Sequence, residues 1–167
     1  MPTQIAEQSA KLGAKHRAAV AERAFMRKAV SLGFAVAKPL GNDDRCDVIV
    51  RYEDVICRVQ VKSVTTKTSA KAFYRVRTIG NRDGCRSTYS REEIDFLAAY
   101  VFPENMWYIF PASVIEHREV VYLRPGCEWS DIEQYREAWR LMKAADTEAD
   151  SQGENAPLKT CSISYRE

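Results

Sequence analysis

The chain has 167 residues, of which 46% are hydrophobic and 29% are charged, and its formal net charge is only +2. This size and composition indicate one globular domain with a substantial core, and the near-neutral balance gives little indication of a nucleic-acid partner. No signal peptide opens the sequence and no apolar run reaches the length of a membrane span. We therefore expect a cytoplasmic protein with no membrane partner.

The cysteines and histidines do not indicate a zinc site. The five cysteines include no Cys-x-x-Cys pair, and the two histidines lack zinc-ligand spacing. Reduced thiols are the simplest interpretation for a cytoplasmic protein.

The hydrophobic periodicity predicts an α/β fold with a mixed central β-sheet flanked by helices. The first half of the chain should form a helix over residues 14–32, strands near 34–38, 46–52, 55–64 and 72–79, and a basic loop over 80–90. The second half should form strands near 95–102 and 106–110, a short helical turn at 111–115 and a strand over 119–123. A helix from 130 or 131 to about 145 should follow. The folded domain would cover residues 1–145, and residues 146–167 would form a flexible acidic linker and C-terminal tail.

Three polar side chains converge in the first predicted hairpin. A register symmetric about residues 53–54 places Asp47 opposite Gln60, with Cβ atoms roughly 4.5–5.5 Å apart. Gln60 and Lys62 point to the same face because strand side chains alternate. An exposed polar face would give the same alternation, but Asp47 precedes the apolar run 48–50, and a buried carboxylate needs a partner or a metal. This face therefore predicts a site for a hard metal ion and a negatively charged reaction centre.

Glu22 is the candidate fourth member of this site. The predicted helix over 14–32 places Glu22 at the edge of its core-facing surface. Two interpretations stay open from the helix alone. Glu22 either contributes to the site or forms an ion pair with a Lys or Arg at a helix–sheet boundary.

A basic segment follows the hairpin. Between residues 67 and 91 the only acid is Asp83, and aromatic residues are interleaved with the basic ones. This composition favours contacts with DNA phosphates, although a solvated charged loop would look similar. The candidate DNA-binding residues are Lys67, Lys71, Arg75, Arg77, Arg82 and Arg86.

The order of these features resembles the PD-(D/E)XK nuclease superfamily and, within it, the group I intron-associated homing endonucleases. The segments that carry the resemblance are Ala19-Val20-Ala21-Glu22, Gly33-Phe34, Pro39-Leu40-Gly41, Arg45-Cys46-Asp47, Arg58-Val59-Gln60-Val61-Lys62, residues 94–100 and residues 107–111. The wider superfamily usually has Glu or Asp at the position of Gln60. The intron-associated branch is known for Gln there, so this departure favours the closer match.

The resemblance implies a restriction-endonuclease-like core and a metal-dependent endonuclease that hydrolyses phosphodiester bonds of double-stranded DNA. The catalytic residues would be Glu22, Asp47, Gln60 and Lys62. Asp47, Glu22, Gln60 and the Val61 carbonyl would bind Mg²⁺, with Mn²⁺ as a substitute, and Lys62 would stabilise transition-state charge.

Three further points follow from the resemblance. A Holliday-junction resolvase or a restriction or repair nuclease of the same fold stays open, as does a DNA-binding protein that does not cleave. Cutting both strands requires two active sites, which predicts a homodimer or homotetramer. Candidate interface residues are the later aromatic and apolar ones: Phe102, Met106, Trp107, Tyr122, Trp129, Tyr135 and Trp139.

Overall fold

The computed structural model describes residues 13–40, 45–68, 73–82 and 84–144. The expected C-terminal tail and the candidate Lys71 lie outside these residues, and Arg82 is described only by its backbone. Within the described ranges, none of the helices combines the length and the apolar character needed to cross a bilayer.

A mixed sheet forms the centre of the molecule, as the periodicity predicts. Its strand order is β1 (Ala35–Ala37), β2 (Val48–Tyr52), β3 (Val55–Val64), β8 (Phe96–Val101) and β9 (Met106–Pro111). Strand β3 runs parallel to β8, whereas the other neighbours are antiparallel. Because β3 is the middle strand, it is hydrogen-bonded on both sides and is a rigid element on which to mount a site.

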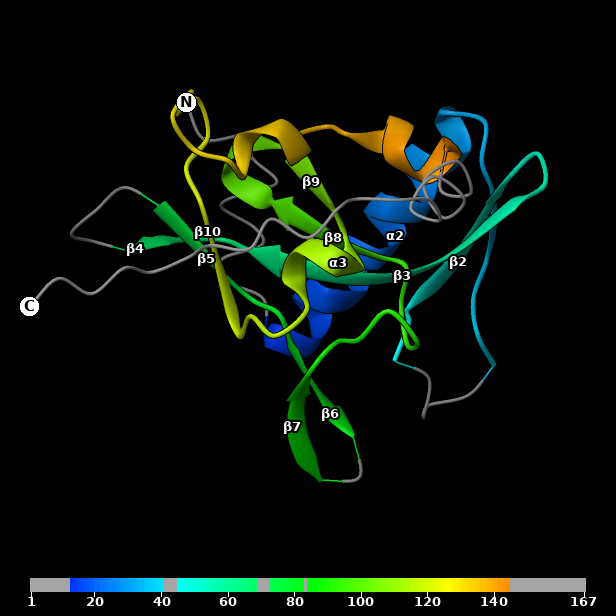
Figure 1. Ribbon diagram of the computed structural model, residues 1–167, viewed down its shortest axis with the longest axis horizontal. Helices are drawn as coiled ribbons and strands as arrows, with labels where there is room; N and C mark the ends of the chain where they lie inside the picture. Colours follow the sequence, from blue (N-terminus) through cyan, green and yellow to red (C-terminus); the bar gives the residue numbers. More distant parts are fainter. Residues whose placement is uncertain (1–12, 41–44, 69–72, 83, 145–167) are drawn as a thin grey trace, which may run out of the picture.

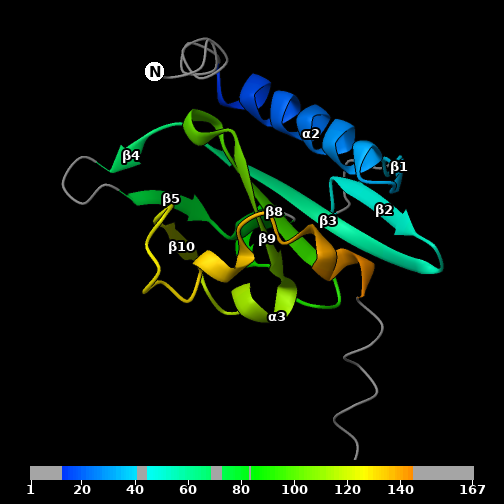
Figure 2. The same ribbon diagram turned by 90° about the horizontal axis from the view of Figure 1, so that it is seen from above.

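Helix α2 (Ala14–Ser31) covers one face of this sheet (Figure 2). Ala21, Phe25 and Ala29 recur at helical spacing and are buried. The Phe25 ring stacks on Trp139 with centroids 5.3 Å apart and meets the edge of Trp107 at 5.5 Å. These contacts fix the helix against the sheet, which in turn fixes the position of Glu22.

A second, smaller sheet packs on the opposite face. Its order is β10 (Val120–Leu123), β5 (Phe73–Arg77) and β4 (Lys67–Thr68), and the short helix α3 (Ala112–Ile115) lies beside it (Figure 2). Side chains of β8 and β9 that point away from α2 meet this sheet in a second core, which includes Leu97, Ala99, Tyr108, Phe110, Tyr74, Val76, Val121 and Leu123. The expected helical turn at 111–115 and strand at 119–123 are both present.

The segment expected as a basic loop over 80–90 is a β-hairpin. Strand β6 (Ile79–Arg82) pairs with β7 (Cys85–Thr88), and the two strands extend away from the body of the molecule as an arm (Figure 1). The pairing of Arg82 with Cys85 leaves a two-residue turn in which Gly84 has φ of +80°. The loop prediction was wrong because the Asp-Gly pair at this position is a hairpin signal that it did not use.

The prediction of a helix from residue 130 or 131 to about 145 is also wrong. In its place are two short 3-10 helices, η2 (Glu133–Tyr135) and η3 (Trp139–Lys143), separated by extended Arg136 and by Glu137 at φ of +49°. The Glu137 backbone N–H donates to the Trp107 carbonyl (2.8 Å), and the Glu137 carboxylate accepts from the Trp107 N–H (2.8 Å). These bonds to β9 replace the helical ones, so tertiary pairing overrides the helical pattern.

Candidate active site

The first hairpin has the predicted register. Tyr52 pairs with Val55, and the pairing continues to Val48 opposite Val59, which places Asp47 opposite Gln60. The Gln60 side-chain N–H donates to Asp47 Oδ2 at 2.5 Å, and the Val61 backbone N–H donates to the same oxygen at 2.9 Å. The hairpin thus aims the carboxylate of Asp47 at β3, where two donors hold it.

Burial controls the charge state of Asp47. Desolvation raises the pKa of the Asp47 carboxyl above its ordinary value, and the nearby charge of Glu22 raises this pKa further. The Val61 N–H and the Lys62 ammonium act in the opposite direction and lower it. The Lys38 charge also lowers it, but desolvation outweighs these effects, and a carboxylate in such surroundings favours the approach of a cation.

Lys62 lies on the same face as Gln60, two residues further along β3. Burial lowers the pKa of the Lys62 ammonium, the Asp47 charge raises it, and the Arg45 charge lowers it. An ammonium in these surroundings is poorly hydrated. It therefore interacts strongly with any anion that reaches the site.

Glu22 reaches this region from α2, on the other face of the sheet. Its carboxylate forms a 2.7 Å ion pair with Lys38, whose side chain is half exposed. This ion pair is the second of the two arrangements that the sequence left open for Glu22, in which it pairs with a lysine at a helix–sheet boundary. The charge of Glu22 nevertheless raises the pKa of Asp47, so the two carboxylates lie within electrostatic reach of each other.

The oxygen donors here fit a hard divalent cation. The Gln60 amide nitrogen lies 2.5 Å from Asp47 Oδ2 and 3.4 Å from the Val61 carbonyl oxygen, so this donor bridges two acceptors that a cation would also bind. In the part of the chain that the structure describes, no three His, Cys, Asp or Glu side chains form a cluster. A metal here would therefore depend on neutral oxygens as well as on carboxylates.

A basic groove of about 480 Å³ begins at Lys62. Arg75 and Arg77 alternate with buried Tyr74 and Val76 along β5, which turns both guanidinium groups outward. The groove is lined by Lys62, Ser63, Arg75, Arg77, Asn81 and Arg86, among others. A second hollow of about 360 Å³ shares Ser63 and Arg75 and adds Arg17 and Lys67. Lys62 of the predicted site thus lines the same groove as Arg75, Arg77 and Arg86, and Lys67 lines the adjoining hollow.

The sequence prediction did not include two residues that lie at the site, Arg45 and Tyr89. Arg45 packs with its guanidinium carbon 4.5 Å from the Tyr89 ring centroid, and Lys62 Nζ lies 5.3 Å from the same centroid. Arg45 lies two residues before Asp47, just outside β2, so its closeness to Asp47 in the sequence was the available signal. Tyr89 carries no such signal, because only the path of the chain as it returns from the β6–β7 arm brings it to Lys62.

Comparison with known proteins agrees with this geometry. The chain belongs to the PD-(D/E)XK endonuclease family, whose model matches residues 12–142. The protein is therefore an endonuclease, and its restriction-endonuclease-like fold is the one that the sequence predicts.

Among solved structures, the chain is similar to the bacterial homing endonuclease I-Ssp6803I. The match has 30% identity and a TM-score of 0.71, and it covers 82% of this chain and 99% of the other. A weaker likeness, with 14% identity and a TM-score of 0.44 over 65% of this chain and 84% of the other, links it to the Holliday junction resolvase Hjc of Archaeoglobus fulgidus. None of the curated proteins compared with the chain matches it.

Proposed function

We propose that this endonuclease is a metal-dependent enzyme that cuts both strands of duplex DNA in the manner of a homing endonuclease. One observation carries the proposal: Asp47, Gln60 and Lys62 converge on one face of the hairpin at the start of a groove lined by arginines. The 30% identity to a homing endonuclease over 82% of the chain supports the same assignment. Cys46, Cys57, Cys85 and Cys127 are reduced thiols in the structure, and this state supports the cytoplasmic location that we propose.

Asp47, Gln60 and the Val61 carbonyl would hold the metal ion, with Glu22 as a further carboxylate. We propose Mg²⁺, with Mn²⁺ as a substitute, because the donors are all oxygens. When bound, the ion neutralises phosphate charge and makes hydroxide available near neutral pH. Gln60 supplies the amide oxygen only if its side chain turns, since its nitrogen now faces Asp47.

Lys62 acts on the phosphate in this proposal. Its half-buried ammonium stands at the start of the groove, where a scissile phosphate would enter. Charge that develops on the phosphate oxygens is stabilised by a poorly hydrated cation that is already in place. Burial lowers the pKa of this ammonium, and the charge of Asp47 partly opposes that effect.

The groove would hold the DNA backbone. Arg75, Arg77 and Arg86 line it beside Lys62, and Lys67 extends the basic surface into the adjoining hollow. We keep Arg82 and Lys71 as phosphate-contacting candidates, since the first lies on β6 and the second lies between β4 and β5 in the chain. Contacts of this kind position the duplex without reading its sequence.

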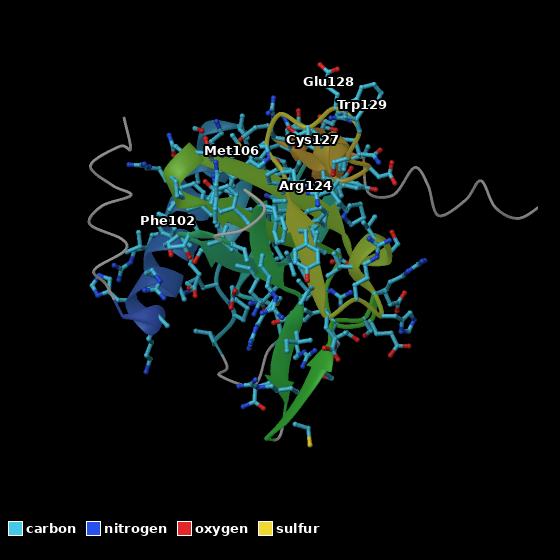
Figure 3. All side chains as sticks on the ribbon, turned by 90° about the vertical axis from the view of Figure 1, so that its left-hand side faces the viewer. Phe102, Met106, Arg124, Cys127, Glu128 and Trp129 are labelled. Atoms are coloured by element: carbon cyan, nitrogen blue, oxygen red, sulfur yellow. The ribbon has the colours of Figure 1, made fainter. Side chains whose placement is uncertain are left out.

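A double-strand cut would need a second copy of the chain, and we propose a homodimer or homotetramer. Of the candidate interface residues, Phe102, Trp107 and Trp139 are buried in the core, whereas Trp129 is 93% exposed and Tyr122 is 48% exposed. Trp129 projects from the surface with Glu128, above Cys127 and Arg124 (Figure 3). An exposed tryptophan of this kind is typical of a protein–protein contact, so we select Trp129 and Tyr122 as the interface residues.

A cleavage assay tests the function. Purified protein is incubated with supercoiled plasmid, linear duplex and four-way junction DNA, each with Mg²⁺ and with EDTA. We expect Mg²⁺-dependent linearisation of plasmid that carries a cognate site. Preferential resolution of the junction would make the protein a resolvase. Binding without cleavage at any Mg²⁺ or Mn²⁺ concentration would make it a DNA-binding protein.

A further inference from the structure

Tyr89 is a buried aromatic residue that faces the two cations nearest the proposed site. Its side chain is 3% exposed, and it follows the last residue of β7. Lys62 Nζ and the Arg45 guanidinium carbon lie 5.3 Å and 4.5 Å from its ring centroid. Burial raises the pKa of the Tyr89 phenol, so the ring is neutral and presents its electron-rich faces to both cations.

Arg45 ties this ring to the arm. Its side chain is only 7% exposed and forms a 3.3 Å ion pair with Glu93. Its Nη1 donates to Ser87 Oγ (3.1 Å), and its Nη2 donates to the carbonyls of Ser87 (3.2 Å) and Thr88 (2.9 Å). Arg45 therefore connects the chain just before Asp47 with the end of the β6–β7 arm.

Gly80 has no side chain, and the Tyr89 ring occupies the space that a Cβ atom there would fill. A Cβ atom at Gly80 would lie 2.6 Å from the Tyr89 hydroxyl oxygen and 2.9 Å from the ring carbon that bears it. Both distances are shorter than a real van der Waals contact. The opposite strand of the arm thus fixes the outer end of Tyr89, and the packing of Arg45 and Lys62 fixes its ring.

We infer that Tyr89 is a positioning residue for Lys62 and that, with Arg45, it couples the β6–β7 arm to the active site. A lysine ammonium on a four-carbon stem has many rotamers, and an aromatic face restricts them. Arg86 and Asn81 of the arm line the same groove as Lys62, so DNA held by the arm meets an ammonium that the arm itself has placed. This inference rests on the role proposed for Lys62.

The first test measures single-turnover cleavage at saturating DNA for Tyr89→Leu and Tyr89→Phe. Removing the ring should lower the rate about tenfold, because an ammonium displaced by even a small distance stabilises the phosphate poorly. The affinity for DNA, measured with Ca²⁺ in place of Mg²⁺, should stay within about twofold. Tyr89→Phe keeps both ring faces and should cleave within about twofold of the unmodified protein.

Tyr52→Leu is the matched control, because Lys143 Nζ lies 4.2 Å from the Tyr52 ring centroid at a position remote from the groove. It should leave the cleavage rate unchanged. An unchanged rate for Tyr89→Leu, an equal loss in Tyr89→Phe, or a loss confined to DNA affinity would each overturn the inference.

Gly80→Ala keeps the inference testable if Tyr89→Leu does not fold. It retains every group at the site but pushes the ring outward, so it should lower the rate without the loss of any side chain. Gly13→Ala is its control, since a Cβ at Gly13 meets no atom within 4 Å. Equal rates for the two alanine variants would overturn the inference.

NMR of lysine side chains tests the contact between Lys62 and Tyr89 without a cleavage assay. The Lys62 ε-methylene signal, assigned by its loss in Lys62→Arg, should be displaced by the ring current in the unmodified protein and in Tyr89→Phe but not in Tyr89→Leu. A signal that does not respond to Tyr89→Leu overturns the inference.

If Lys62→Ala still cleaves at the normal rate, the proposed site is wrong. If Lys62→Ala is inactive while Tyr89→Leu cleaves normally, only the positioning role of Tyr89 fails.

Discussion

The Gln60 amide and the Asp47 carboxylate meet across the β2–β3 hairpin at 2.5 Å, with the amide nitrogen as the donor. Through this contact the neutral Gln60 side chain holds the Asp47 carboxylate in place without a cation. A carboxylate at position 60, which is usual in the wider superfamily, would instead place two like charges in contact. Gln60 thus holds Asp47 without adding a like charge to the site.

Gln60→Glu should make stability depend on the metal. In the metal-free protein the variant loses a hydrogen bond and gains repulsion with Asp47, which should lower the free energy of unfolding by about 1–3 kcal/mol. Mg²⁺ should restore much of this loss, because a cation bound only by the folded state stabilises it. Thermal unfolding with and without Mg²⁺ measures both effects, with exposed Gln134→Glu as the control. An equal Mg²⁺ response in the variant and the unmodified protein would contradict a metal at this position.

Asp47→Ala and Lys62→Ala should each abolish cleavage and leave DNA binding largely intact, because the proposed mechanism places both residues at the scissile phosphate rather than along the groove. Gln60→Ala should reduce cleavage less than Asp47→Ala, since water can replace a neutral ligand at a smaller electrostatic cost. Glu22→Ala should weaken cleavage. The checks are plasmid cleavage and gel-shift affinity, with the exposed Asp131→Ala and Lys28→Ala as controls. Near-normal cutting by either the Asp47 or the Lys62 variant would show that the site is elsewhere.

Replacing Arg75, Arg77 and Arg86 with alanine should weaken duplex binding and its dependence on salt. Each lost phosphate contact should reduce the slope of log K against log salt by about one. Fluorescence anisotropy at several salt concentrations measures the slope. A triple alanine variant of Arg23, Arg27 and Arg140, which are exposed and line neither the groove nor the adjoining hollow, provides a charge-matched control. If the slope responds to the control and not to the groove variant, DNA binds another face.

Trp129→Ser and Tyr122→Ser should shift the protein toward monomer. Both side chains are exposed in the single chain, and removing aromatic area weakens an interface without disturbing the core. Light scattering at micromolar concentration, with and without DNA, gives the mass. A monomer mass for the unmodified protein under both conditions would refute the proposed assembly.

Phe25→Ala should lower the free energy of unfolding by about 3–5 kcal/mol, because Phe25 is fully buried against Trp107 and Trp139. Val30→Ala on the same helix is 60% exposed and should change stability by less than about 0.5 kcal/mol. Urea unfolding followed by circular dichroism compares the two. Similar midpoints would mean that α2 does not pack as described.

The parts of the fold that local pattern determines were predictable. A two-residue turn and strict alternation fix the register of the first hairpin, and with it the contact between Asp47 and Gln60. The segment 130–145 shows the opposite case. Its apolar spacing buries Trp139 and Met142 as expected, but the bonds of Glu137 to Trp107 break the helix. Tyr89 could not be placed beside Lys62 because its position depends on how a whole arm docks.

The tryptophans fall into two environments that an optical experiment can separate. Trp107 and Trp139 lie 5.8 Å apart in the core, and the indole N–H of Trp139 donates to Glu137 at 2.8 Å, whereas Trp129 is almost fully exposed. Iodide should therefore quench only the red-shifted part of the emission, and the blue-shifted part belongs to Trp107 and Trp139, whose rings meet edge to face under α2. The chain thus carries tryptophan signals of two kinds: Trp129 reports surface association, and Trp107 and Trp139 report the integrity of the layer behind β3.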